Sequence, residues 1–324
     1  MKKKIILGIS ILVIIIIAGI LVFNLIKSPA TPGKIKIGYQ PLTVNAALYA
    51  AIEQGYFSKN NVEVEMVRFE TTDQIVNALI TGQIDMSGII AYYPLLSVET
   101  QTADRFKIFA ANQQNDSEHI DFLIVSSDPS IIQYNNLSDL ANKKIGIFPG
   151  SSTRAIVKVM LKSDPGLIDK VTIIEIPGAN QVAALKAKQV DALITLEPFA
   201  TIAVVNGAGK IAVKSPFSKY VLNNFTLGAA AISQSFNTKK KALCSRAIES
   251  FYMGIDFLRT NGSEARKYLA KYTPIQGTVV DQVNLGNTLK INELDINSMQ
   301  KLVSIYKDEG ELVTEVDVRK MLIK

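Results

Sequence analysis

The feature of this sequence that most constrains its fold is an internal duplication. The motif Ile-Gly-x-x-Pro occurs at residues 37–41 and again at 145–149, an offset of 108 residues. A second pair of matches, Ala-Leu followed by Gln-x-Asp, occurs at residues 78–85 and again at 184–191, an offset of 106. Short motifs recur by chance, but two matches in the same order at nearly the same offset favour a true repeat. We therefore predict two units of the same fold.

Each copy has a pattern of alternating strands and helices. In the first copy, Lys34–Pro41 predicts a strand and a turn, and Asn45–Gln54 predicts a helix that ends before a glycine. Val62–Met66 alternates apolar and acidic residues, as a half-buried strand does. A further helix then leads to a short apolar strand, at Met86–Ile90 in the first copy and at Ala192–Leu196 in the second. Such alternation predicts a mostly parallel sheet covered by helices.

The last hundred residues have a different pattern. Phe225–Ile232 is apolar and predicts one more strand. Helices are expected after it at Lys239–Arg259, Ser263–Tyr272, Leu294–Asp308 and Glu315–Leu322.

The amino terminus has the composition of a membrane segment. Lys2–Lys4 precede Ile5–Ile26, a run of 22 residues without a charge. At about 1.5 Å per residue, a helix of this length crosses the ~30 Å hydrocarbon core of a bilayer. The lysines favour a cytoplasmic amino end, with the rest of the chain exported. We predict an uncleaved anchor at 1–27 and an exposed linker at 28–33. The alternative is a cleaved signal peptide, which would leave the protein secreted or periplasmic.

The composition excludes several classes of function. The formal charge is +6, but the first 27 residues hold four lysines and no acid, so the rest has 35 − 4 = 31 basic and 29 acidic residues. This near balance of charge does not predict a basic surface that binds nucleic acid. Cys244 and His119 are the only residues of their kinds, which excludes internal disulfides, cysteine-built zinc sites and most catalytic triads. We expect no metal and no cofactor.

Several motifs, taken together and in order, carry a family resemblance. In the first copy they are Gly38–Pro41, Ala47–Ala50, Gln54–Phe57, Val62–Glu65 and Ala78–Met86. In the second copy they are Lys144–Ile147, Pro149–Ser151, Val182–Asp191 and Glu197–Phe199. The chain resembles, over about residues 34–280, the solute-binding proteins of ABC importers for nitrate, sulfonate, taurine and thiamine-precursor pyrimidines. It departs from that family at Leu196, where an aromatic residue is common, and at Asn61, where glycine is common.

The resemblance implies a fold and a set of partners. The fold is the periplasmic-binding-protein type II fold, in which two doubly wound α/β lobes are joined by two crossover strands and enclose a ligand cleft. Lobe 1 would comprise 34–118 and 232–324, and lobe 2 would comprise 119–231. The protein is expected to be a monomer on the outer face of the cytoplasmic membrane. It would serve the permease and ATPase subunits of an importer without changing its ligand.

Ligands of open parallel sheets bind beyond the carboxyl ends of the strands, where helix amino termini point. This rule selects candidate ligand-binding residues in both copies. From the first copy they are Gln40, Pro41, Asn45, Thr71, Thr72, Ala91 and Tyr92, and from the second they are Gly150, Ser151, Ser152, Thr153, Arg154 and Glu197.

Two of these predictions, and the placement of His119, have alternatives. Hydroxyls, helix amide groups and a guanidinium at Ser151–Arg154 could hold a small oxyanion, or the serines could cap a helix while the arginine faces solvent. Glu197 could bind the ammonium group of a zwitterion or bond to the backbone. Tyr92 is the aromatic side chain most expected to contact a planar ligand. His119 could line the hinge or be an exposed loop residue.

These observations predict capture of a small anionic or zwitterionic solute by lobe closure, followed by its delivery to a permease. A binding protein for a thiamine-precursor pyrimidine and a sensory ectodomain are the alternatives. An enzyme similar to a pyrimidine synthase, which uses histidine and a cysteine-rich motif, is the least favoured, because this chain offers only His119 and Cys244 and Cys244 lies inside a predicted helix.

Overall fold

The computed structural model describes residues 32–115, 118–275 and 277–324. The predicted anchor at 5–26 and most of the linker at 28–33 lie outside the described residues. Among the residues that are described, no helix combines the length and the apolar character needed to span a bilayer. The description that follows concerns the compact unit Lys34–Lys324.

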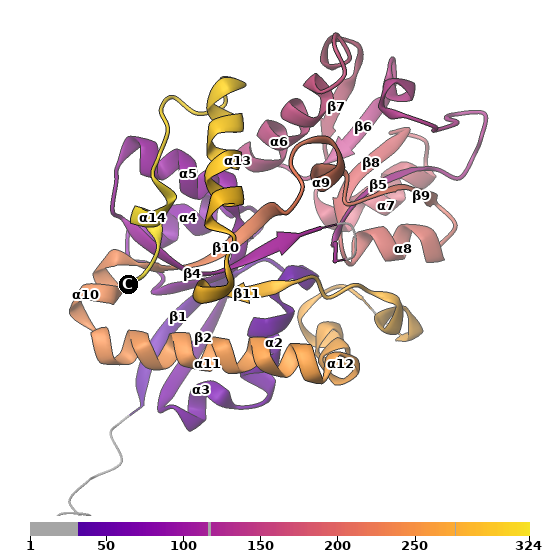
Figure 1. The fold of residues 1–324 in the computed structure, drawn as a ribbon. Helices are drawn as coiled ribbons and strands as arrows, with labels where there is room; N and C mark the ends of the chain where they lie inside the picture. The colour runs from indigo at the N-terminus through magenta and orange to yellow at the C-terminus, as the bar shows by residue number, and fades with distance from the viewer. Residues whose placement is uncertain (1–31, 116–117, 276) are drawn as a thin grey trace, which may run out of the picture. The chain divides into compact units, whose positions relative to one another are not determined.

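This unit is built on two β-sheets (Figure 1). The six-stranded sheet has the order β11-β4-β10-β3-β1-β2, and the five-stranded sheet has the order β7-β6-β8-β5-β9. The strands of the first are β1 (Gly33–Tyr39), β2 (Val62–Arg68), β3 (Met86–Ala91), β4 (Phe106–Gln114), β10 (Phe225–Ser233) and β11 (Thr288–Lys290). The strands of the second are β5 (Asp121–Ser126), β6 (Lys144–Ile147), β7 (Thr172–Glu175), β8 (Ala192–Leu196) and β9 (Gly209–Lys214).

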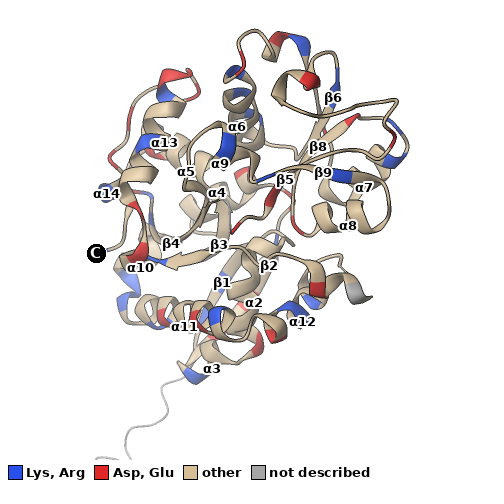
Figure 2. Ribbon diagram, turned by 45° about the vertical axis from the view of Figure 1, so that its right-hand side comes forward, with Lys and Arg blue, Asp and Glu red and all other residues tan. Residues whose placement is uncertain are grey.

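Helices cover both faces of each sheet (Figure 1). Those of the first sheet are α2 (Ala46–Glu53), α3 (Tyr56–Lys59), α4 (Thr72–Ile80), α5 (Tyr92–Gln101), α10 (Gln234–Lys239), α11 (Lys241–Thr260), α12 (Gly262–Tyr272), α13 (Ile296–Asp308) and α14 (Val318–Met321). Those of the second are α6 (Ser151–Lys162), α7 (Gly178–Lys186), α8 (Phe199–Val205) and α9 (Pro216–Tyr220). In the first sheet, α2, α3 and α11 lie on one face, and α4, α5 and α13 lie on the other (Figure 1 and Figure 2).

The two copies share a strand order and a stabilising contact. The order β2-β1-β3 of the first copy matches β7-β6-β8 of the second. The aspartate of each Gln-x-Asp motif bonds to the first strand of its own copy. Asp85 Oδ2 accepts from the Lys36 amide at 2.9 Å, and Asp191 Oδ2 accepts from the Lys144 amide at 2.7 Å. The repeated motif therefore has the same structural role in both copies.

The expectation of mostly parallel sheets holds for only part of each sheet. Strand β1 pairs parallel with β3, and β6 pairs parallel with β7 and β8. Strand β10, however, runs antiparallel to β3 and β4, and β5 runs antiparallel to β8 and β9. Strands β10 and β5 each enter their sheet from the other copy, and β11 also pairs antiparallel with β4. The sheets are mixed for this reason.

The chain passes between the sheets twice, after β4 and before β10. The predicted lobe boundary at 118/119 lies between β4 and β5. The predicted boundary at 231/232 lies inside β10, whose pairing with β4 begins at Phe225. The change of sheet therefore precedes Phe225, and the division into lobes stays a prediction.

Close packing of α11 against α2 leads to a stability test. A Cβ atom on Gly254 would lie 2.2 Å from the Ala47 carbonyl oxygen, and backbone cannot move aside as a side chain can. We expect Gly254→Ala to lower the free energy of unfolding by about 1–3 kcal/mol or more, as overpacking of a core does. Urea denaturation followed by circular dichroism measures this change.

A matched control is Gly262→Ala at the start of α12. Its added Cβ would have Leu285 Cδ1 as its nearest neighbour, at 3.7 Å, an ordinary contact. Since alanine also favours helix, this variant should be at least as stable as the wild type. Equal stability of the two variants would contradict the packing argument.

Candidate functional site

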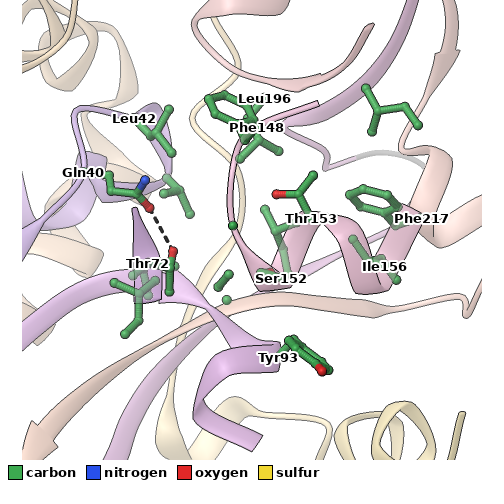
Figure 3. Close-up of a pocket in the computed structure, with 18 of the residues that line it drawn as sticks. Gln40, Leu42, Thr72, Tyr93, Phe148, Ser152, Thr153, Ile156, Leu196 and Phe217 are labelled. Carbon is green, nitrogen blue, oxygen red and sulfur yellow. Dashed lines mark hydrogen bonds between the residues drawn. The ribbon is translucent and has the colours of Figure 1, made fainter. Parts of the chain in front are cut away.

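A cavity lies where the carboxyl ends of strands from both sheets meet (Figure 3). The first sheet contributes residues after β1, at the end of β3 and on β10. The second contributes Phe148–Gly150 after β6, the last residues of β8 and the first turns of α6. This is the place at which open α/β sheets bind ligands.

Several of the predicted residues line the cavity: Gln40, Thr72, Ala91, Gly150, Ser152 and Thr153. Gln40 and Thr72 bond to each other, with Thr72 Oγ1 donating to Gln40 Oε1 at 2.9 Å, as Figure 3 shows. The same figure shows Ser152 and Thr153 on α6, across the cavity from that pair. The rule of strand ends and helix starts therefore located the cavity in both copies.

Other predicted residues lie beside the cavity without lining it. Asn45 is fully buried; its Nδ2 donates to the Gln40 carbonyl at 3.1 Å and its Oδ1 accepts from the Ile89 amide at 2.7 Å. It thus holds the ends of β1 and β3 together. Thr71 caps α4 in a capping box with Gln74. Pro41 is half-buried next to Gln40 and is not part of the lining.

The aromatic side chain of α5 that lines the cavity is Tyr93, not the predicted Tyr92. Tyr92 is only 1% exposed and packs in the core, whereas Tyr93 lines the cavity. Tyr93 donates its hydroxyl hydrogen bond to the Glu311 carbonyl at 2.8 Å. Successive residues at a helix start point in different directions, so only one of the two can face the cavity.

The predicted oxyanion segment has partners within the protein. Ser151 donates from its amide to Asp73 Oδ2 at 3.0 Å and from its hydroxyl to Asp73 Oδ1 at 2.6 Å. Arg154 forms an ion pair with Glu175, and 49% of its side chain is exposed. Neither Ser151 nor Arg154 lines the cavity. The prediction of an anion contact at this segment therefore gains no support.

Glu197 also bonds within the protein and lies outside the lining. It is 2% exposed, and burial raises the pKa of its carboxyl. Its oxygens accept from the Thr201 amide at 3.1 Å, the Thr201 hydroxyl at 2.8 Å and the Asn284 amide at 3.5 Å. Of the two alternatives left open by the sequence, this geometry favours bonding to the backbone.

His119 differs from the expectation of an exposed loop residue. It is 6% exposed, and its ring lies edge-on to Phe122 with centroids 5.3 Å apart. It sits in the connection between β4 and β5 and does not line the cavity. Packing against β5 is what removes it from solvent.

Polar contacts join the two sheets' helices and loops on both sides of the cavity. On one side, besides Asp73–Ser151, ion pairs join α6 to the segment after α13: Lys158–Glu311 at 3.6 Å and Lys162–Glu309 at 3.0 Å. On the other side, the Thr43 amide donates to the Glu197 carbonyl at 3.3 Å. The described residues thus adopt a closed arrangement around the cavity.

Comparisons with known proteins agree with this geometry. The model of the NMT1-like family matches residues 28–272, about three quarters of the chain. The chain belongs to the NMT1-like family. No curated protein matches its sequence.

Solved structures share the fold of this NMT1-like protein at low sequence identity. The alkanesulfonate-binding protein SsuA from Xanthomonas axonopodis pv. citri, bound to MOPS, is 19% identical with a TM-score of 0.72 over 91% of this chain and 99% of its own. The aliphatic sulphonate-binding SsuA of Escherichia coli is 17% identical, with a TM-score of 0.70 over 90% and 92%. The nitrate-binding NrtA of Synechocystis PCC 6803 is 15% identical, with a TM-score of 0.69 over 88% and 84%. The resemblance to solute-binding proteins and the α/β periplasmic-binding-protein fold are confirmed.

Much of the lining of this cavity is apolar and was not predicted from the sequence. These residues are Leu42, Val44, Ile89, Ile90, Phe148, Pro149, Ile156, Ile194, Leu196, Phe217, Phe225, Leu227 and Gly228. Asp73, Tyr93, Thr195 and Tyr306 complete it. The strand-end rule could have found Ile89, Ile90 and Ile194 had it been applied to apolar residues. No local sequence pattern predicts that Phe217 of α9 or Tyr306 of α13 lines the cavity, because both lie far in sequence from the ends of β1, β3, β6 and β8, which contribute other parts of the wall.

A buried carboxylate supports the aromatic wall formed by Phe217 at the start of α9. Asp121, the first residue of β5, accepts from the Phe217 amide at 3.2 Å and from the Ser215 hydroxyl at 3.4 Å. The side chain is 1% exposed, and burial raises the pKa of its carboxyl to about 6.

This raised pKa predicts a pH dependence of stability. Between about pH 4, near the pKa of a free aspartate, and pH 6, the folded protein binds more protons at Asp121 than the unfolded chain does. The contribution of Asp121 to the free energy of unfolding should therefore fall as pH rises through this window, and the loss should persist above it. Asp121→Asn should remove this contribution, as measured by urea denaturation across the window. Asp308→Asn, at an exposed position of α13, controls for the loss of one charge. Identical pH profiles for Asp121→Asn and the wild type would contradict the prediction.

Proposed function

We propose that this NMT1-like protein is the solute-binding component of an ABC importer. Its two lobes would close over a small molecule, and the closed form would deliver that molecule to a permease. A ligand shifts such an equilibrium only through contacts that differ between the open and closed forms. The observation that carries the proposal is a cavity lined from both sheets and bordered by contacts that join them.

The proposal includes a location on the outer face of the cytoplasmic membrane. It is motivated by the charge-free run at 5–26 behind Lys2–Lys4 and by the periplasmic proteins of the same fold. An anchor of this kind would keep the protein at a high local concentration near its permease. Cleavage near residue 30 would instead release it, and the amino-terminal sequence of the mature protein distinguishes the two cases.

Binding without chemistry is the favoured activity. The thiol of Cys244 is buried in α11, and burial raises its pKa to about 12, so it is a poor nucleophile. His119 and Cys244 both lie outside the cavity lining. These placements support a role for the protein as a receptor and argue against an enzyme.

A pair of adjacent positions on α6 tests the binding site. Thr153 lines the cavity and Arg154 does not. Thr153→Trp should fill the cavity and weaken solute binding by about tenfold or more, whereas Arg154→Ala should bind as the wild type does. The solute would first be identified by exposing the immobilised protein to a metabolite extract and analysing what it retains by mass spectrometry. Affinities would then follow from isothermal titration.

The mass of the retained molecule also tests the class of function. A receptor should release its solute chemically unchanged. Conversion of the solute, or failure of the wild type to retain any molecule, would contradict the proposal. Equal binding by Thr153→Trp and the wild type would place the solute elsewhere.

A further inference from the structure

The cavity has the lining of a site for an uncharged molecule. Among the described residues, its wall contains no lysine, arginine or histidine, and its one carboxylate is that of Asp73. Aromatic rings come from both sheets, including Phe148, Phe217 and Tyr306, and aliphatic side chains such as Ile156 and Leu196 lie between them. An anion moved from water into such an apolar wall would lose its hydration without gaining a counter-charge.

Most polar groups of the wall are already hydrogen-bonded to the protein. The side-chain oxygen of Gln40 accepts a hydrogen bond from Thr72, and the side-chain nitrogen Nε2 of Gln40 donates to the Glu70 carbonyl at 2.9 Å. The Thr195 hydroxyl donates to Gln181. The groups left for a ligand are few. Within the described residues, the hydroxyls of Ser152, Thr153 and Tyr306 belong to lining residues and have no hydrogen bond to another group. Such groups can orient a ligand but cannot neutralise a charge.

At the start of α6, a position suited to an oxyanion holds a carboxylate of the protein itself. Helix α6 begins at Ser151, and its cap residue Gly150 offers no side chain. Asp73, from the first turn of α4, accepts both the amide and the hydroxyl hydrogen bonds of Ser151. A helix amino terminus favours one negative charge, and here Asp73 supplies it. A second anion beside Asp73 would be repelled.

We infer that the ligand is an uncharged, largely apolar molecule, and that Asp73 determines this specificity by occupying the anion position at the start of α6. The inference rests on the proposed function, since it names the class of solute that the receptor takes. Asp73 also links α4 to α6 across the cavity, so it excludes anions from the closed form in particular.

The test compares two classes of probe by isothermal titration against the full chain. The oxyanions are nitrate and methanesulfonate, and the uncharged probes are phenol and indole. The variants are Asp73→Ala, which frees the start of α6, and Asp73→Asn, which keeps an oxygen for the Ser151 amide but removes the charge. Circular dichroism and thermal melting show whether each variant is folded.

We expect the wild type to bind phenol or indole, and to bind both oxyanions at least about tenfold more weakly than Asp73→Ala does. Asp73→Asn should bind oxyanions more tightly than the wild type if charge is what excludes them. Equal oxyanion affinity in the wild type and both variants would overturn the inference, as would failure of the wild type to bind either uncharged probe.

Failure of the inference and failure of the proposed function give different results. If the wild type retains an anionic solute from the metabolite extract, the receptor function stands and the inference on ligand class is wrong. If it retains no solute at all, the receptor function fails.

Discussion

Parallel neighbouring strands of one copy need a crossover between them, and this constraint sets the position of the site. Because β1 and β3 run in the same direction, as do β6 and β8, each pair delivers its carboxyl ends to a single edge of its sheet. The loops and helix starts that follow those ends are therefore gathered at that edge. The aspartates of the two Gln-x-Asp motifs bond to the strands β1 and β6 and so reinforce this arrangement.

The contact between Asp73 and Ser151 shows how a general binding motif can be used by the protein itself. A helix amino terminus facing a cleft is a common place for an anionic ligand. In this chain the negative charge comes from Asp73 of α4, which belongs to the other sheet, so the same electrostatics serve to join the helices of the two sheets. Much of the remaining wall is apolar, and burial of apolar ligand surface would then supply a large part of the binding free energy.

Local patterns predicted the elements well where the pattern has a single structural meaning. The helix at Asn45–Gln54, the strand at Val62–Met66 and the long helix at Lys239–Arg259 correspond to α2, β2 and α11. The patterns were weaker guides to the direction of a side chain. Tyr92 and Tyr93 are adjacent and chemically alike, and only the packing of α5 decides which of them reaches the cavity. The pairing of Arg154 with Glu175, 21 residues away, is likewise invisible to a local pattern.

The sequence by itself determined the duplicated α/β units, the alternation of strands and helices along each unit and the strand ends at which a ligand would bind. These follow from hydrophobic periodicity and from repeated motifs, which act over a few residues. Only the tertiary structure decided the chemistry of the cavity. Its character depends on Asp73 meeting Ser151 and on Phe217 and Tyr306 joining one wall. Contacts between distant segments depend on how the two sheets and their helices pack, and no short stretch of the chain encodes that packing.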